Sequence, residues 1–186
     1  RFLLHAQKLL ELQRAAKQEI GSGALAQVAV RVGAIESVLH SWLIPWIQQL
    51  RAEYPTLELE LTVETTPVLI DQLRRGVLDL AFAALPATGE SVRTKSLLAM
   101  DMCFVGNSEI HTKRKYALKD FEEFDLLTFQ RGSQPYVGLL DLLKSQGVQP
   151  RKVHAISSIS AMVQLVQGGF GVATLPAAAV ARLREA

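Results

Sequence analysis

The stretch from Ile159 to Pro176, ISAMVQLVQGGFGVATLP, decides the fold that we predict for this chain. Its first half places apolar side chains at helical spacing, so that one face of a helix can pack on a sheet. Gly168 and Gly169 follow, and we expect both to adopt the positive φ that ends a helix and turns the chain. The segment Gly171 to Leu175 is then predicted to be a short strand, apolar enough to be central and parallel. Pro176 ends this strand, because proline cannot donate to the ladder.

The same pattern occurs once earlier, from Leu69 to Pro86, as LIDQLRRGVLDLAFAALP. An amphipathic helix is again followed by a glycine (Gly76), a buried strand (Leu78 to Leu85) and a closing Leu-Pro. Two copies about 90 residues apart predict two similar α/β lobes in one chain. The alternative is a chance repetition of a common βαβ pattern, because such units recur in unrelated folds.

Composition limits the class of protein. The chain has 186 residues, 49% hydrophobic and 20% charged, which is typical of a globular protein. Its 20 basic and 18 acidic residues are too balanced to favour nucleic-acid binding by this segment. No apolar run is long enough to span a bilayer, and no signal peptide is expected. The single cysteine, Cys103, excludes an internal disulfide and lies in a predicted buried strand.

Residues 1–23 are predicted to form a linker helix and a hinge. Gly21-Ser22-Gly23 supplies the flexible joint after the helix. A helix of this length needs a partner, either the rest of the chain or a second copy of itself. Its residues Phe2, Ala6, Leu9, Gln13, Ala16 and Ile20 repeat at spacings of four and three, the seam of a short coiled coil, and all of them except Gln13 are apolar.

Two lobes are predicted to follow this helix. Residues 24–100 form the first lobe with a crossing segment, and residues 101–186 form the second. In each lobe we expect a strand, a long helix, a strand, a short helix and a strand, in that order. The strand Leu57 to Glu64 alternates apolar and polar residues, which indicates the edge of a sheet. Pro45 is expected to kink the long helix of the first lobe or to mark its first turn.

Hydroxyl side chains occur at four predicted turns from a strand into a helix. Ligands of parallel sheets bind beyond the carboxyl ends of the strands, where helix N-termini present free N–H groups. If the lobes face each other, these turns converge on one cleft that suits a small anion such as a carboxylate or sulfonate. An arginine at one turn adds a charge-assisted hydrogen bond. The candidate residues are Ser37, Thr65, Thr66, Arg131, Ser133 and Ser157.

Helix capping is the plainer explanation of each hydroxyl. Ser37 is predicted to be the N-cap of the long helix in the first lobe, and Ser157-Ser158 to cap the helix that opens this section. The joint pattern of four such turns nevertheless favours the cleft.

Catalytic and metal-binding patterns are weak. The four histidines have no metal-binding spacing, and no nucleophile lies beside a base. Residues 168–171 resemble a phosphate-binding loop but follow a helix and precede a strand, which is the wrong order. Glu36 and Asp79 are interpreted as a surface residue and a strand-entry residue, and the basic run His111 to Tyr116 as a solvated loop or, alternatively, an anion-binding patch. The sequence therefore predicts no enzyme, cofactor or metal site.

These features together resemble the LysR-type transcriptional regulators, over their linker helix and effector-binding domain. The resemblance covers nearly the whole chain. It implies two Rossmann-like lobes of the type 2 periplasmic-binding-protein fold, joined by crossing strands around a cleft and preceded by an amphipathic linker helix. The matching segments are Val30 to Gly33, Leu43 to Pro45, Tyr54-Pro55, Gly76 to Ala81, and Met162-Val163 to Pro176.

The resemblance also implies a function. A small-molecule effector would bind at Ser37 and Thr66, and at Ser133 and Ser157 in more variable turns. It would stabilise one lobe orientation and so change the geometry of a homodimer or homotetramer. A bacterial, cytoplasmic protein without membrane contact is implied. DNA would be bound only through the family's N-terminal domain, which this segment lacks, and the chain stops at Ala186, before the family's usual return to the first lobe.

Two other functions share this fold. A solute-binding receptor of a transport system is the main alternative, and the coiled-coil seam argues against it because a secreted receptor does not need one. An enzyme such as a deaminase or dehydratase would require an acid/base pair in the cleft, which the sequence does not show.

Overall fold

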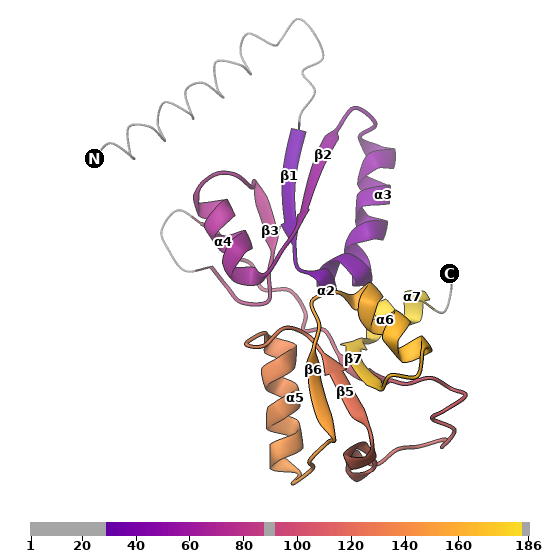
Figure 1. The fold of residues 1–186 in the computed structure, drawn as a ribbon. Coiled ribbons are helices and arrows are strands. Elements are labelled where there is room, and N and C mark those ends of the chain that lie inside the picture. Colours follow the sequence, from indigo (N-terminus) through magenta and orange to yellow (C-terminus); the bar gives the residue numbers. More distant parts are fainter. Residues whose placement is uncertain (1–28, 88–91, 184–186) are drawn as a thin grey trace, which may run out of the picture.

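The computed structural model describes residues 29–87 and 92–183, which form an α/β fold with two sheets. Figure 1 shows the two sheets one above the other, joined through an extended segment, residues 92–101. The predicted linker helix and hinge, residues 1–23, lie outside the described residues.

The first sheet has three parallel strands in the order β2-β1-β3. The edge position that the alternating sequence predicted for β2 is confirmed. The third strand is shorter than the predicted segment Leu78 to Leu85. The elements are β1 (Ala29–Ala34), α2 (Glu36–Val38), the π-helical turn η1 (Leu39–Leu43), α3 (Ile44–Glu53), β2 (Glu58–Val63), α4 (Thr66–Arg74) and β3 (Leu80–Phe82).

The second sheet has four strands in the order β4-β7-β5-β6. Strand β7 is central as predicted, but it runs parallel only to β5 and antiparallel to β4. Pro176 is its last residue and pairs with Met102. The elements are β4 (Met102–Val105), the 3₁₀ helix η2 (Leu118–Glu123), β5 (Asp125–Thr128), α5 (Gln134–Ser145), β6 (Lys152–Ala155), α6 (Ile159–Gln167), β7 (Val172–Pro176) and α7 (Ala177–Leu183).

The predicted internal repeat appears in the strand order. The first sheet has the order β2-β1-β3, and the second contains β6-β5-β7, with every pair in both sets parallel. In each set the first strand of the unit is central, with the second and third on either side. The second sheet adds β4 at its other edge. A boundary between lobes at residues 100 and 101 stays a prediction.

Apolar side chains cover both faces of the second sheet. Leu126 and Leu127 are neighbours in β5 and therefore point to opposite faces. Leu127 packs with α6, and Leu126 packs with α5 and η2. A third cluster lies under the helix that follows β1 and contains Ala34, Val38 and Leu43.

The proline in the long helix is accommodated by a wide turn. Pro45 lies in the first turn of α3, as predicted, directly after the π-helical turn η1. It has no N–H to donate to the carbonyl of Ser41 four residues earlier. Arg182 of α7 donates to that carbonyl instead, with an Nη1–O distance of 3.3 Å. The turn η1 is thereby joined to α7.

Two glycines fix the backbone around β7. Helix α6 ends at the predicted pair, but only Gly169 has a positive φ, of 77°, whereas Gly168 has a φ of −73°. One left-handed residue is enough to end a helix. Gly171 lies so close to Asp125 that an added Cβ would overlap the Asp125 carbonyl oxygen. The approach of β7 to β5 therefore requires glycine at this position.

We expect Gly171→Ala to lower the free energy of unfolding by about 1–3 kcal/mol, because backbone atoms must shift to make room. Gly138→Ala is the matched control, since nothing lies within 4 Å of its Cβ position in α5. It should raise the free energy of unfolding by roughly 0.5–1 kcal/mol, because alanine is the better helix former. Urea denaturation measures both, and equal effects of the two changes would contradict the close approach.

Candidate functional site

The carboxyl ends of β1, β2, β5 and β6 each lead into a turn that carries predicted site residues. Figure 1 shows these turns at the junction between the two sheets. The helices that begin there are α2, α4, α5 and α6. Their first N–H groups have no partner within the helix, and the helix dipoles make this region favourable for negative charge.

Ser37 is buried inside α2 and does not cap it. The N-cap is Ile35, so the helix begins earlier than predicted. Ser37 as a whole residue is only 7% exposed. Its carbonyl accepts a hydrogen bond of 2.5 Å from Ser41 Oγ. Within the described residues, no hydrogen bond to the Ser37 hydroxyl is found.

Thr65 and Thr66 lie where β2 leads into α4. Thr65 is the N-cap, but its side chain makes no capping hydrogen bond. Thr66 Oγ1 accepts a hydrogen bond of 3.1 Å from the N–H of Ala84. This contact joins the start of α4 to the chain that follows β3. Thr66 thus already has a structural role at the junction.

The predicted residues of the second sheet are less closely organised. Ser133 caps α5, and its Oγ accepts from the N–H of Tyr136 at 3.4 Å. Ser158 caps α6, whereas Ser157 is exposed, so only half of the predicted capping pair acts as a cap. Arg131 is exposed and pairs with no acidic residue in the described part of the chain. No hydrogen bond or ion pair between described residues joins these side chains to Ser37 or Thr66.

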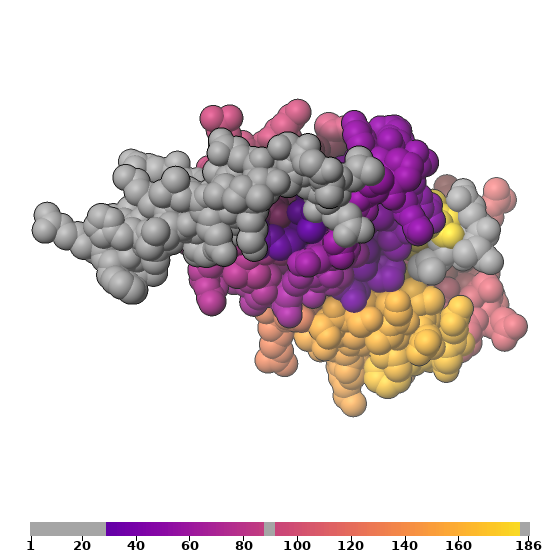
Figure 2. Space-filling view, turned by 90° about the horizontal axis from the view of Figure 1, so that it is seen from above, coloured from indigo at the N-terminus to yellow at the C-terminus, as the bar shows by residue number. Residues whose placement is uncertain are grey.

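Glu36 bridges the two sheets. Its Oε2 accepts a hydrogen bond of 2.5 Å from the N–H of Ile159, the first residue of α6. His40 Nε2 lies 3.8 Å from the same oxygen. A carboxylate at a helix N-terminus satisfies a free N–H group and is stabilised by the helix dipole. Figure 2 shows orange residues of this region packed against the indigo residues that follow β1.

The interpretation of Glu36 as a surface residue is therefore wrong. Its side chain is only 25% exposed and is held by a partner 123 residues away. A pair of residues so far apart leaves no local pattern in the sequence. The one feature that could have indicated a role for Glu36 at the site is its position in the same turn as Ser37.

Asp79 lies at the entry of β3, as predicted, and is paired with Arg31. Arg31 Nη2 lies 2.6 Å from Asp79 Oδ1, and its Nε lies 3.1 Å from Oδ2. The side-chain hydrogen bond to Asp79 raises the pKa of Arg31 above its usual value. Asp79 Oδ2 also accepts from the Arg31 backbone N–H. The pair holds β3 beside β1 and lies before the carboxyl end of β1.

Other kinds of site find little support. In residues 29–87 and 92–183, no group of three or more His, Cys, Asp or Glu side chains could hold a metal ion. No helix in these ranges is long and apolar enough to cross a membrane.

Comparison with known families identifies the class of protein. Residues 24–186 match the LysR substrate binding domain, and the chain belongs to this family. The resemblance predicted from the sequence is confirmed.

Three known proteins illustrate the relationship. The transcriptional regulator YofA of Bacillus velezensis is 25% identical over 178 residues, which are 96% of this chain and 60% of YofA. CbnR, a LysR family transcriptional regulator of known structure, has a TM-score of 0.71 at 20% identity over 97% of this chain and 64% of the CbnR chain. The BenM effector binding domain, solved with its effector benzoate, has a TM-score of 0.65 at 20% identity over 82% of this chain and 71% of that one.

These matches define what the chain is. The structures show the predicted α/β fold of the type 2 periplasmic-binding-protein kind. The family and its regulators show an effector-binding domain of a LysR-type regulator rather than an enzyme or a transport receptor. The chain spans about three fifths of the length of YofA.

We expect Glu36→Gln to weaken the contact between the sheets, because a neutral acceptor binds an N–H less strongly than a carboxylate does. Exchange of the Ile159 amide hydrogen with deuterium should accelerate roughly fivefold. Glu58→Gln, at an exposed position of β2, is the control and should leave this rate unchanged. Equal rates in all three proteins would show that the bond contributes nothing in solution.

Proposed function

We propose that this chain senses a small anionic effector in a cleft between two lobes, residues 24–100 and 101–186. The observation that supports this best is the Ser37 hydroxyl. Ser37 is only 7% exposed, its hydroxyl has no hydrogen-bond partner in the described part of the chain, and it lies beside Glu36, which contacts the first residue of α6. Its oxygen is not among the fully enclosed polar atoms of the described residues, so the hydroxyl can donate to a ligand at the junction.

The proposed anionic character of the effector rests on the helix ends at the junction and on Arg131. Four helices begin at the junction and direct N–H groups towards it. Arg131 has no acidic partner among the described residues and can pair with a carboxylate or sulfonate. The proposed contacts are Ser37, Thr65, Thr66, Arg131, Ser133 and Ser157. The BenM domain was solved with benzoate, a carboxylate, which agrees with this class of ligand.

Glu36 gives the proposed site a switching mechanism. Its carboxylate occupies the N–H of Ile159 at the start of α6. An anionic effector that approaches this helix end competes with Glu36 for the same positive region. Displacement of Glu36 breaks a contact between the two sheets and permits another lobe orientation. The size of the effect is limited by the difference in effector affinity between the two orientations.

We propose that effector binding acts by changing the geometry of an oligomer. Leu61 and Val63 are 39% and 36% exposed on the edge strand β2. No other described strand pairs with the outer edge of β2, and exposed apolar side chains on such a strand favour association with another chain. We propose that the chain forms a homodimer or homotetramer through a surface that includes this strand. A change in the arrangement of the subunits would then change the spacing of the DNA-binding domains in the whole protein.

We expect benzoate, used as the probe, to raise the melting temperature. At ten times its Kd, mass action adds about 1.4 kcal/mol, or roughly 3–6 °C for a domain of this size. The double variant Ser37→Ala, Thr66→Ala should lose this shift. Thr112→Ala, Ser145→Ala is the matched control, because both residues are exposed and lie away from the junction. A shift that survives in the first variant would place benzoate outside the proposed cleft.

A charge on the edge strand should reduce self-association. We expect Leu61→Lys to lower the apparent mass measured by light scattering after size exclusion, because burial of an unpaired ammonium is costly. Glu60→Lys introduces the same side chain on the opposite face of β2 and should leave the mass unchanged. An unchanged mass in Leu61→Lys would exclude this surface.

A further inference from the structure

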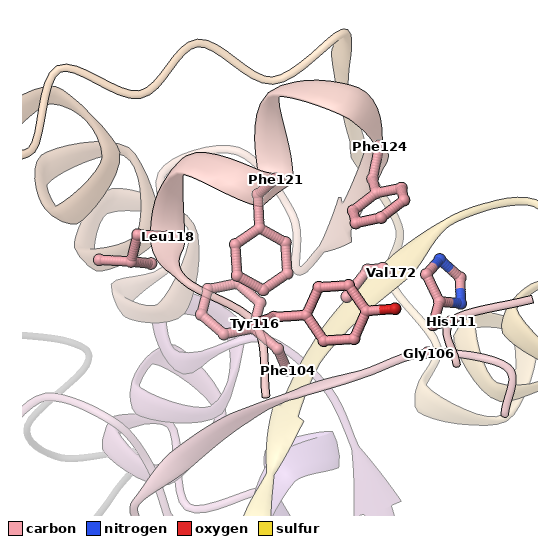
Figure 3. Close-up of a pocket in the computed structure, with 8 residues that line it drawn as sticks. All are labelled: Phe104, Gly106, His111, Tyr116, Leu118, Phe121, Phe124 and Val172. Atoms are coloured by element: carbon pink, nitrogen blue, oxygen red, sulfur yellow. The ribbon is translucent and has the colours of Figure 1, made fainter. Parts of the chain in front are cut away.

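We propose a second ligand site, separate from the cleft, that takes a neutral molecule with one aromatic ring and a hydroxyl group. The site is a pocket of about 260 Å³ beside the second sheet, here called the aromatic pocket. Figure 3 shows its lining, which consists of Phe104, Gly106, His111, Tyr116, Leu118, Phe121, Phe124 and Val172.

The aromatic pocket lies at the opposite end of the sheet from the cleft. Phe124 directly precedes β5, and Val172 is the first residue of β7. Val172 is the register partner of Leu126, near the amino end of β5. The effector residues proposed above lie instead beyond the carboxyl ends of the strands. A ligand in the aromatic pocket would therefore leave the cleft free.

Five rings surround the aromatic pocket. Phe104 and Phe121 are stacked with their centroids 4.3 Å apart, and His111 meets Phe124 edge to face at 4.8 Å. Tyr116 lies edge to face with Phe124 at 5.9 Å. These faces and edges favour a flat aromatic guest in offset or T-shaped contact.

The volume fits a single ring. An apolar cavity of about 150 Å³ is enough to bind benzene, and typical sites for drug-sized ligands begin near 300 Å³. The value of about 260 Å³ lies between these limits. A one-ring molecule with a small substituent fits this space.

Two polar atoms of the lining select a hydroxyl group. His111 Nδ1 lies 3.0 Å from the carbonyl oxygen of Asn107, which can only accept, so Nδ1 carries the hydrogen. In the neutral ring, Nε2 is then an acceptor, and it has no hydrogen-bond partner among the described residues. Tyr116 Oη accepts from the N–H of Lys113 at 3.2 Å and keeps its own hydrogen to donate. Figure 3 shows this hydroxyl directed towards the His111 ring.

A neighbouring glycine makes room for this arrangement. A Cβ at Gly106 would lie 2.8 Å from His111 Nδ1, closer than real Cβ atoms approach. Any other residue at Gly106 would push the imidazole away from the Asn107 carbonyl. The orientation of His111 is thus fixed from both sides.

Lys113, which lies over the Tyr116 ring beside the aromatic pocket, is already paired with a carboxylate. Lys113 Nζ lies 2.9 Å from Asp120 Oδ1, and Asp120 also accepts from the N–H of Ala117. The hydrogen bond from Lys113 lowers the pKa of Asp120, and the same bond raises the pKa of Lys113. Both groups therefore stay charged and paired at neutral pH. The lining of the aromatic pocket contains no lysine or arginine, and Lys113 is occupied by Asp120, which together favour a neutral ligand such as a phenol.

Titration with phenol, followed by ¹H–¹⁵N correlation spectra, tests this proposal. Phenol is neutral at pH 7 because its pKa is near 10, as for tyrosine. We expect saturable shifts at residues 104–124 and 172, and tighter binding of phenol than of toluene. His111→Phe keeps a ring but removes the acceptor, so it should weaken phenol roughly two- to tenfold and leave toluene unchanged within twofold.

Three further proteins complete the test. Tyr116→Phe removes only a hydroxyl and should also weaken phenol selectively, which guards against misfolding of His111→Phe. His154→Phe is the matched control, because this histidine does not line the aromatic pocket. Ser37→Ala, Thr66→Ala should bind phenol as the wild type does, even if the proposed effector cleft is wrong. Absence of saturable shifts, equal binding of phenol and toluene, or loss of phenol in the cleft variant would overturn the proposal.

Discussion

Parallel strands bring their carboxyl ends to one edge of a sheet, and this constraint determines where the two halves of the protein meet. It applies twice, in β2-β1-β3 and in β6-β5-β7. Each sheet directs its helix N-termini to the junction, where unsatisfied N–H groups accumulate. Glu36 accepts a hydrogen bond from one of these groups, the N–H of Ile159, across the junction. The proposed effector site and the proposed switch both require that the carboxyl edges of the two sheets face each other.

Much of the fold was predictable because its signals are local. Helical spacing, the alternation in β2 and the glycine stops at Gly76 and Gly169 act over a few residues, and the structure contains these elements close to the predicted positions. The internal repeat and the family resemblance were inferred from the order in which these helix, strand and glycine signals occur along the chain. The boundary of α2 was missed, so Ser37 was wrongly assigned as a cap. A difference of two residues at a helix start is enough to move a side chain from the surface to the interior.

The rest could not be predicted, because it depends on residues that are distant in the chain. Asp79 and Arg31 are 48 residues apart, and Glu36 and Ile159 are 123 apart. The antiparallel pairing of β4 with β7 likewise depends on the path of the crossing segment. The aromatic pocket is a similar case, since its rings come from β4, the loop that follows it and η2. The basic run His111 to Tyr116 suggested solvent, yet its first and last side chains line that pocket.

The bond from Arg182 to the Ser41 carbonyl has a consequence for biosynthesis. These residues are 141 positions apart, so the first sheet leaves the ribosome long before Arg182 is made. Domains generally fold from the N-terminus as they emerge. During that interval, the Ser41 carbonyl lacks the Arg182 donor and is open to water. The segment formed by η1 and α3 therefore gains this contact only when α7 docks, which makes maturation of the two halves interdependent in time.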